Sequence, residues 1–578
     1  MKSNILNQNL RREGYSLLLV IIFSSISFLM LGSALDWCLT NGRLTDRNNQ
    51  YYATAAAAEA ATEKVLSALT RDYTAQGEAL VYYNLRVYRD LVPRSNEDQS
   101  WAHFAFNDGS GNGSQTRVER LSAASSYLPL NSKYRGMYGA ASTYRILSSA
   151  RMLDAPYEID VGVKQDIQLA TIPVFQFAIF YTMDMEVNPG PDMKVTGRVH
   201  CNANINLQPG TSLTFMSDVT AAGQIIHNKH TNDPSARSLG ASRIVYEGEH
   251  DSGADALTLP IGTNSTPAAI HAIIEIPPAG ESPTSAMGRQ RYYNKSDMIV
   301  IVSNATVLVT SGLANGFATS IASNEWGSFL RTNVSFYNKR EGKTINGVEV
   351  NVAKLKTWSA TNASLRPALG NRDVRSVYVA DMRTQSASTQ SGVKVVQAAE
   401  LPSLGLTVAT PNPLYVQGHF NAQGTDVGAN ATDNAKPASL VGDSINILST
   451  AWADGNSALA LANRRAADTT VNAAILAGNV PSGGGYYSGG VENFPRFLEN
   501  WSSRTLTYNG SMVAMFPSTI ATAVWGGADV YSPPARNWAF DENYTDPLRL
   551  PPGTPEVRAV IKSVWETVAG TKASVTPL

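Results

Sequence analysis

Cysteine and charged residues are scarce in this chain of 578 residues. The two cysteines, Cys38 and Cys201, fall in segments of different character, so we expect two free thiols and no bridge between them. A disulfide from Cys38 to another chain, or its lipidation, stays open as an alternative. Charged residues make up 16% of the chain and the net charge is −1. Without a basic stripe to neutralise a phosphate backbone, the sequence disfavours nucleic-acid binding.

Motifs of common catalytic sites are also missing. No glycine-rich loop ends in Gly-Lys-Ser or Gly-Lys-Thr, which argues against a P-loop ATPase. No convincing Gly-x-Ser-x-Gly segment marks a nucleophile elbow. The sequence therefore predicts neither an enzyme nor a cofactor.

Histidines give the nearest approach to a metal site. His227 and His230 are spaced so that a helix could bring both imidazoles together, but they lie in a polar stretch without a recognisable zinc motif. We therefore expect solvated histidines and no metal. Farther upstream, His200 is predicted to face outward from a short strand, and Cys201 to face inward as a small apolar residue.

A carbohydrate-cleaving site would need paired carboxylates beside aromatic residues. Carboxylates and aromatic residues are both present, but their pattern is also typical of residues in the core and at corners of the fold. We interpret them as structural residues. The carboxylates are Asp154, Glu158, Asp160, Glu492, Glu499, Asp541 and Glu542, and the aromatic residues that enrich the C-terminal third are Tyr486, Tyr487, Trp501, Trp525, Tyr531, Trp538 and Tyr544.

One long apolar run, from Tyr15 to Leu35, organises the chain. As a helix it would be roughly 30 Å long, about the thickness of the hydrocarbon core of a bilayer. A single segment in lipid can satisfy its backbone only by being helical. The run is therefore predicted to span a membrane as a helix.

Basic residues stand on the N-terminal side of this run. They are Lys2, Arg11 and Arg12, and no further Lys or Arg comes before Arg43. The positive-inside rule then places the N-terminus in the cytoplasm and the long remainder outside it. A cleavable signal peptide is the alternative, because residues 31–34 offer small side chains, although the run is long for such a signal.

The predicted helix continues beyond the apolar run. Neither Pro nor Gly occurs from Leu44 to Tyr73, and the Ala-rich part repeats apolar residues at helical spacing. An apolar half joined to an amphipathic half predicts one long rod. The residues on its amphipathic face are Ala58, Ala61, Val65, Ala68 and Leu69.

The segment from Arg11 to Val20, RREGYSLLLV, resembles the start of type IV prepilins, especially X-type minor pilins and K-type pseudopilins. In that family a short charged leader ends in Gly and is removed by the prepilin peptidase. The resemblance implies that Gly14 ends the leader and that Tyr15 is the mature first residue. Major pilins carry Glu at the fifth mature position, where this chain has Leu19, and this departure indicates a tip or accessory subunit.

The resemblance also implies how the helix assembles. Its apolar side chains would join the helices of neighbouring pilins in the core of a fibre. The residues expected to make these contacts are Leu17, Leu18, Leu19, Ile21, Ile22 and Phe28.

The rest of the chain reads as mainly β, which gives an α+β class with a long N-terminal helix. The segment from Tyr157 to Leu169 alternates apolar and polar residues at period two, as a half-buried strand does. The run from Ile172 to Tyr181 is predicted to be one buried strand. Short alternating pieces separated by Gly, Asn or Asp then recur about every eight residues, which is typical of a β-solenoid.

The same patterns suggest a division of the chain. A hairpin is predicted over 298–309, a glycine loop at 483–490, a short helix at 491–501 and a capping helix at 555–568. The predicted units are a leader (1–14), a transmembrane and rod helix (15–75), a pilin-like α/β unit (76–184), a β-solenoid-like body (185–482) with an insertion at about 228–412, and a C-terminal β-rich segment with the capping helix (483–578).

These features predict a structural subunit in the bacterial inner membrane. Its expected partners are other pilin or pseudopilin subunits, the prepilin peptidase and the membrane, and the body offers a surface for a glycan or another surface ligand. Two alternatives stay open. One is a membrane-anchored β-helical adhesin or carbohydrate-active protein unrelated to pili, and the other is an envelope scaffold that polymerises through the ends of the solenoid.

Overall fold

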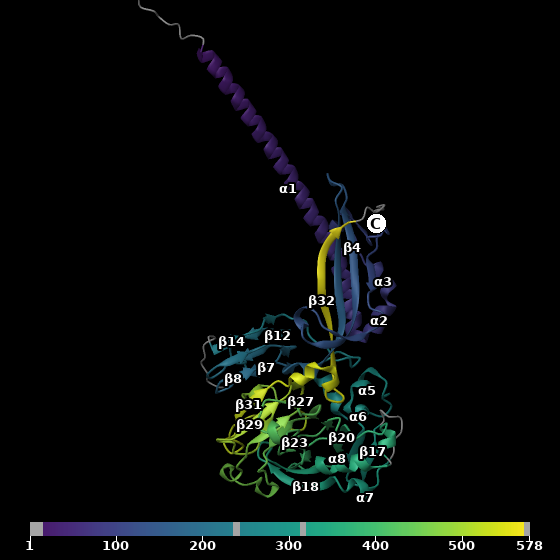
Figure 1. The fold of residues 1–578 in the computed structure, drawn as a ribbon, viewed down its shortest axis with the longest axis vertical. Coiled ribbons are helices and arrows are strands. Elements are labelled where there is room, and N and C mark those ends of the chain that lie inside the picture. The colour runs from purple at the N-terminus through teal and green to yellow at the C-terminus, as the bar shows by residue number, and fades with distance from the viewer. Residues whose placement is uncertain (1–14, 235–242, 313–319, 364, 571–578) are drawn as a thin grey trace, which may run out of the picture.

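The computed structural model describes residues 15–234, 243–312, 320–363 and 365–570. The predicted leader, including Gly14, lies outside the described residues. Helix α1 (Tyr15–Gln76) is one continuous rod that projects from the body, as Figure 1 shows. Its first half is exposed, whereas its second half buries a stripe of residues spaced three or four apart, including Ala58, Ala61 and Val65. The predicted long helix is confirmed.

A six-stranded antiparallel sheet, here called the rod sheet, packs against the second half of α1. Its spine is the pair β4 (Tyr138–Met152) and β5 (Asp160–Pro173), which are bonded along almost their whole length. Three short strands, β1 (Phe104–Asn107), β2 (Arg117–Arg120) and β3 (Ser126–Pro129), pair one after another with the other side of β4. The strand predicted from Tyr157 to Leu169 is confirmed from Asp160 onward, but most of its residues are buried, so burial does not alternate as predicted for a half-buried strand.

The segment between the rod helix and the rod sheet is helical at first. It forms α2 (Glu78–Tyr83) and α3 (Leu85–Arg89). Val81 and Tyr88 are buried against Val65 and Leu69 of α1. These two helices complete the apolar core between the rod and the rod sheet.

The C-terminal segment is the third long strand of the rod sheet, β32 (Glu556–Ala569), and the predicted capping helix is wrong. Val557, Ala559 and Ile561 are buried at period two, while Val564 and Trp565 are exposed. The same apolar residues fit a helical period, so the local pattern was ambiguous. Antiparallel pairing with β5, from Glu556 opposite Pro173 to Ala569 opposite Val161, decides in favour of a strand.

Between β5 and β32 the chain builds the whole body. The apolar run from Ile172 to Tyr181 is divided by a 3-10 turn at Val174–Gln176, so it is two strands and not the single strand predicted. Its first residues end β5 in the rod sheet, and its last residues form β6 (Ile179–Tyr181). The body therefore leaves the rod sheet at Pro173 and returns to it at Glu556.

The first part of the body, the N-terminal stack, passes in turn through three parallel sheets. Paired residues in the first turns are 20 apart, as in Ile179 with Val199 and Met185 with Ile205, and those of the last turn are 31 apart, as in Leu213 with Ile244. This regular repeat explains the spaced short segments in the sequence. The strands are β6, β7 (Met185–Val187), β8 (Met193–Val195), β9 (Val199–Cys201), β10 (Ile205–Leu207), β11 (Leu213–Phe215), β12 (Val219–Ala221), β13 (Ile225–Ile226), β14 (Ile244–Tyr246) and β15 (His250–Ser252).

A linking segment then crosses the outer face of the body. It contains α4 (Pro267–Ile270), α5 (Ala286–Gln290) and α6 (Tyr292–Lys295). Ile270, Ile273 and Tyr292 from this segment are buried on that face. The segment thus covers a sheet that would otherwise expose apolar side chains.

The second part of the body, the C-terminal stack, again consists mainly of parallel strands. The predicted hairpin is confirmed as the antiparallel pair β16 (Met298–Val302) and β17 (Val307–Ser311). The remaining elements are α7 (Ser323–Trp326), β18 (Leu330–Asn338), β19 (Lys343–Asn351), α8 (Val352–Thr361), α9 (Leu365–Ala368), β20 (Ser376–Asp381), β21 (Thr389–Val396), β22 (Leu406–Ala409), β23 (Leu414–Gln417), β24 (Ala438–Gly442), β25 (Ile445–Leu448), β26 (Thr469–Asn472), β27 (Ala474–Asn479), β28 (Arg496–Phe497), β29 (Thr505–Asn509), β30 (Met512–Pro517) and β31 (Ala535–Ala539).

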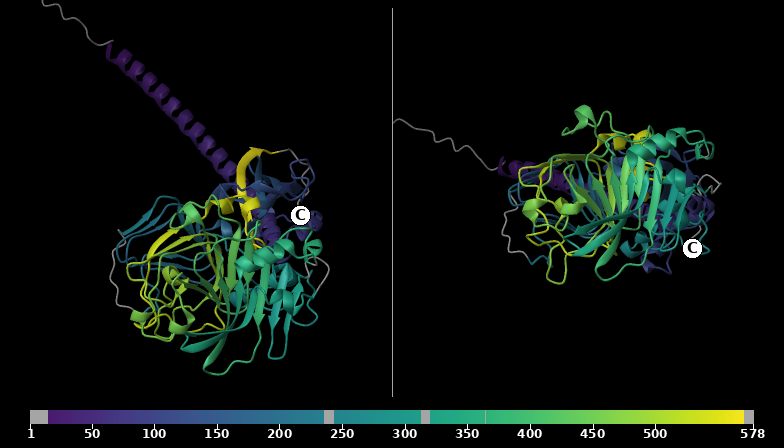
Figure 2. Two further views of the ribbon diagram at one scale, coloured as in Figure 1. Left: turned by 60° about the horizontal axis from the view of Figure 1, so that its bottom comes forward. Right: turned by 90° about the horizontal axis from the view of Figure 1, so that it is seen from below.

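One sheet of eleven strands, the central sheet, runs through both stacks in the order β15-β12-β9-β6-β30-β27-β24-β22-β20-β16-β17. The chain enters it near the middle at β6, winds outward to β15, and then returns from the far end to β30, which pairs in parallel with β6. Figure 2 shows these strands side by side, with α1 projecting away. β16, β20 and β22, which lie within residues 228–412, belong to this sheet.

Both faces of the central sheet are buried, which explains its uninterrupted apolar strands. One face lines the interior of the stacks, where Ile179, Val199 and Val219 lie in register. The other face carries Phe180, Tyr378 and other apolar residues against the linking segment. The short helix predicted at 491–501 is also replaced, by a 3-10 turn at Val491–Asn493 and by β28, because β28 pairs with β25.

Candidate functional site: the exposed helix and its attachment

The first half of α1 is the largest exposed apolar surface of the described chain. Every residue from Tyr15 to Asn49 is exposed, a length of about 50 Å at the rise of an α-helix. Within the described residues, α1 is the one helix long and apolar enough to span a membrane, with a mean hydropathy of 2.4 over its most apolar 18 residues. No carboxylate or basic group occurs from Tyr15 to Leu35.

The residues predicted to assemble with other subunits all lie on this exposed half. Leu19, at the position where a carboxylate is usual in major pilins, has 49% of its surface exposed, and Tyr15 has 75%. The apolar residues surround the helix rather than forming a stripe, as in helices that are enclosed by lipid or by other helices. The full set is Leu17, Leu18, Leu19, Ile21, Ile22 and Phe28.

The helix becomes attached to the body at Gln50, its first buried residue. The Gln50 side-chain amide donates to the carbonyl oxygen of Tyr157, and the Tyr157 backbone N–H donates to Gln50 Oε1 at 3.2 Å. The Tyr157 hydroxyl also donates to the carbonyl of Arg43 at 3.1 Å. The turn that contains Tyr157, between β4 and β5, therefore holds α1 where the rod meets the body.

Farther along, β32 contributes charged contacts to the rod. Lys562 Nζ lies 3.0 Å from Glu63 Oε1, and Arg558 Nη1 donates to the carbonyl of Thr74 at 2.7 Å. The Arg558 guanidinium also lies over the Tyr73 ring, 5.8 Å from its centroid. The last strand of the chain thus holds the second half of the first helix.

The histidine and cysteine residues do not form a reactive site. His200 is buried and not outward in solvent as predicted, because the linking segment covers that face: its ring packs against Phe180, and its Nδ1 lies 2.8 Å from Thr220 Oγ1. Burial lowers the pKa of His200 to about 4 and raises the pKa of the Cys201 thiol to about 12. Cys201 faces inward, as predicted, and both cysteines are free thiols in the structure.

The two spaced histidines bind different partners. His227 Nε2 lies 2.9 Å from the Tyr246 hydroxyl, and His230 Nε2 lies 3.2 Å from Asp184 Oδ2. Among the residues that the structure describes, no group of three or more His, Cys, Asp or Glu side chains has the arrangement of a metal site.

The candidate carboxylates are also dispersed. Asp160 forms an ion pair with Arg151, and Asp541 accepts hydrogen bonds from Thr432 Oγ1 and Asn543 N. Glu492 and Glu499 line different cavities. Glu499 accepts two hydrogen bonds from Ser449, and burial raises the pKa of Glu499 to about 7.

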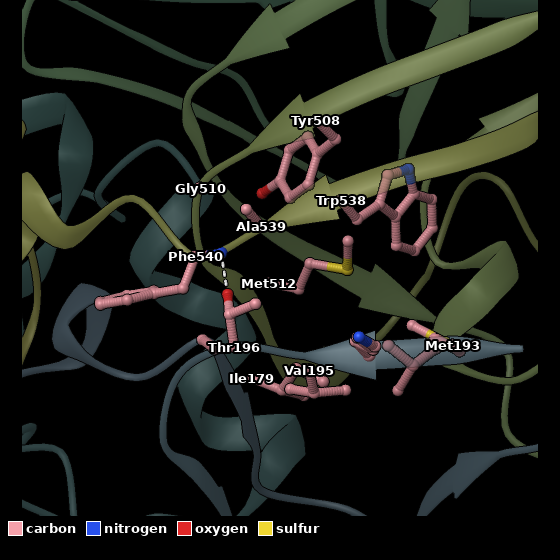
Figure 3. A pocket seen from close by; sticks show the side chains of 13 residues that line it. Ile179, Met193, Val195, Thr196, Tyr508, Gly510, Met512, Trp538, Ala539 and Phe540 are labelled. Carbon is pink, nitrogen blue, oxygen red and sulfur yellow. Dashed lines mark hydrogen bonds between the residues drawn. The ribbon is translucent and has the colours of Figure 1, made fainter. Parts of the chain in front are cut away.

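An apolar hollow marks the line where the two stacks meet between β8 and β31 (Figure 3). Its volume is about 30 Å³, room for roughly one water molecule. Met193, Met512 and Trp538 face into it, and Phe540 N donates to Thr196 Oγ1 across its edge at 2.7 Å. It is a packing seam between the stacks rather than a ligand site.

Comparison with known proteins yields no family model and no curated relative that matches this chain in sequence. Among solved structures, the competence-associated pilin ComZ from Thermus thermophilus is similar over 90% of this chain and 97% of its own. The two chains share 10% identity, with a TM-score of 0.29. At that TM-score the similarity carries no weight for function, which must come from the geometry of this chain.

Proposed function

We propose that this protein is a structural subunit of the pilin type: a minor pilin or pseudopilin of a type IV pilus or a type II secretion system. The observation that carries the proposal is the division of α1 into two halves. The half from Tyr15 to Asn49 is exposed and mostly apolar, while the half from Gln50 onward is held by the rod sheet. The exposed half of such a helix can insert into a membrane or a helical bundle, while the packed half attaches the body to it.

The first step in this role is processing of the N-terminus. The prepilin peptidase would cut between Gly14 and Tyr15, in the segment RREGYSLLLV. Before assembly, residues 15–35 would span the inner membrane, with the basic leader in the cytoplasm and the body in the periplasm. Asp36, directly after the span, would lie at the periplasmic surface of the inner membrane.

Assembly would then transfer the apolar half of α1 from lipid to a bundle of pilin helices. Leu19 lacks the carboxylate that major pilins use to pair with a neighbour's N-terminus, and the body of almost four hundred residues is bulky beside the rod. Both points favour a tip or initiation role over a repeating one. In this scheme the two stacks form a β-solenoid-like body that contacts partners outside the fibre. Adhesion to a surface would be one such role.

The units that serve this scheme are the leader (1–14), the rod (15–75), the pilin-like unit (76–184), the solenoid-like body (185–482) and the C-terminal segment (483–578). Because β32 pairs with β5, it completes the sheet of the pilin-like unit. The rod, the rod sheet and β32 would act together as the assembly module.

The test is the N-terminus of the protein recovered from membranes, measured by mass spectrometry with and without the prepilin peptidase. We expect a chain that begins at a methylated Tyr15 only when the peptidase is present. A Gly14→Leu variant should stay uncut, whereas Gly32→Ala, at a position with free space around it, should be cut normally. Met1 retained in both strains would contradict the proposal and leave the membrane-anchored adhesin or carbohydrate-active protein as the function to pursue.

A further inference from the structure

A second cavity, larger than the hollow of Figure 3, lies where three segments of the body meet. They are the corner Asn188–Pro191 of the N-terminal stack, the end of the glycine loop with Tyr487, and the segment from Trp525 to Arg536. The cavity volume is about 490 Å³, within the range of roughly 300–1,000 Å³ that is usual for small-molecule sites.

Aromatic rings form one wall of this cavity. Tyr487 and Trp525 meet edge to face, with ring centroids 5.4 Å apart and an interplanar angle of 78°. The indole N–H of Trp525 donates to the Tyr531 hydroxyl at 2.9 Å, and that hydroxyl donates to Asn493 Oδ1. Trp525 is half-buried. Its ring is therefore oriented in advance, and a ligand that stacks on it would lose little rotamer entropy of the protein.

Polar groups of both charges stand beside the aromatic wall. The buried Glu492 carboxylate accepts from the Tyr487 hydroxyl at 3.2 Å and from the Asn188 N–H at 3.3 Å. Arg536 donates to the Glu492 carbonyl and to Asn493 Oδ1. Burial raises the pKa of Glu492 and lowers the pKa of Arg536, so burial disfavours the charged form of each. With one acid and one base facing the cavity, a neutral ligand fits better than an anion or a cation.

The glycine loop is what allows these side chains to converge. Gly489 and Gly490 have φ values of +98° and +69°, a region that suits glycine. A Cβ on Gly489 would lie 2.7 Å from the Trp525 ring, and one on Gly490 would lie 2.4 Å from the Tyr487 hydroxyl. The last two glycines of the run GGGYYSGG thus leave room for the Trp525 and Tyr487 side chains that form the wall of the cavity.

We propose that this cavity binds a neutral, pyranose-containing oligosaccharide, which stacks on Trp525 and hydrogen-bonds to Glu492, Asn493 and Arg536. A sugar ring has an apolar face for an indole and a rim of hydroxyls that both donate and accept, as these three polar residues require. A quaternary ammonium would face the Arg536 guanidinium, and an anionic sugar would face Glu492. The site goes beyond the assembly role and works whether or not the chain enters a fibre.

The test uses the full chain in lipid nanodiscs, because sugar-headed detergents would compete for the cavity. Chitohexaose, cellohexaose and maltohexaose are titrated by calorimetry, together with choline and a sialylated oligosaccharide as charged probes. We expect saturable binding of at least one neutral hexasaccharide and none of the charged probes. Trp525→Ala should weaken that binding about tenfold or more.

The matched control is Trp326→Ala, which removes a tryptophan of similar partial burial in α7, and it should bind as wild type does. Tyr531→Phe keeps the ring and removes the hydroxyl that orients Trp525, so a smaller loss is expected, and this variant decides the matter if Trp525→Ala does not fold. Three results would each overturn the proposal. The first is that none of the three neutral sugars binds, and the second is that a charged probe is preferred. The third is that wild type and Trp525→Ala bind with equal affinity or, where that variant does not fold, that wild type and Tyr531→Phe do. None of these results depends on processing at Gly14.

Discussion

Gln50 and Tyr157 bond to each other in both directions, side-chain amide to carbonyl and backbone N–H to amide oxygen. The pair lies at the point where α1 passes from an exposed half to a packed half. This pair is the first of the contacts that hold the second half of α1 to the rod sheet.

Gln50→Ala should loosen this attachment. The Tyr157 backbone groups would lose their partners at a partly buried position, which costs about 1 kcal/mol. Hydrogen exchange should rise in the turn at residues 155–158 and in α1 around Arg43 to Thr54, in the full chain in nanodiscs. Asn49→Ala, at the exposed neighbour, is the control. Unchanged exchange in Gln50→Ala would mean that other contacts hold the rod.

Substitutions in β32 should separate its buried side from its exposed side. Ile561→Lys places a charge in the core and should destabilise the chain by more than about 3 kcal/mol. Val564→Lys, at an exposed position, should change the free energy of unfolding by less than about 0.5 kcal/mol. Denaturant titration of both variants is the measurement. Equal losses in the two variants would support the helical pattern in place of the strand.

Glu499 should make stability depend on pH. Burial raises its pKa from 4.5 to about 7, so the folded chain holds a proton that the unfolded chain releases. The stabilisation that this group contributes is complete below about pH 4.5 and is lost as the pH rises through 7. Relative to wild type, Glu499→Gln should gain up to about 3 kcal/mol between pH 4.5 and pH 8.

Denaturant midpoints measured at several pH values in that window test this expectation. Glu542→Gln, at an exposed carboxylate, is the control and should follow the wild-type curve. A Glu499→Gln curve parallel to wild type would show that folding does not raise the pKa of Glu499.

Cys201 should resist thiol reagents while the chain is folded. It is buried within the N-terminal stack, and burial raises the pKa of its thiol to about 12, so the thiolate is scarce at neutral pH. A Cys38→Ala chain should therefore take up maleimide only after denaturation. The Cys201→Ala chain serves as the reference for Cys38. Rapid labelling of folded Cys38→Ala would indicate that the stack opens near β9.

Local patterns in the sequence predict the rod helix well and the strands of the body only in part. Residues 15–76 have one consistent helical pattern, apolar at first and Ala-rich afterwards, and no breaker after Gly42. In β32, by contrast, the apolar residues satisfy both a helical and a strand period, and pairing with a strand almost four hundred residues away decides between them. Periodicity alone does not contain that information.

The order of the central sheet could not be read from the sequence either. The sequence shows short alternating pieces, but β6 lies between β9 and β30, which are far apart along the chain. The residues of the cavity were recognised only as a set of aromatic side chains and carboxylates. Their convergence depends on where three distant segments meet and on two glycines with positive φ.

The body is inserted between two neighbouring strands, since Pro173 at the end of β5 pairs with Glu556 at the start of β32. A chain that leaves the ribosome N-terminus first therefore makes the rod at once and the strand that secures it last. A product truncated anywhere in the body would carry an unfinished sheet with β5 as a bare edge, and it would lack the contact between Lys562 and Glu63. A rod secured by this last contact is therefore a feature that only a chain synthesised through β32 can have.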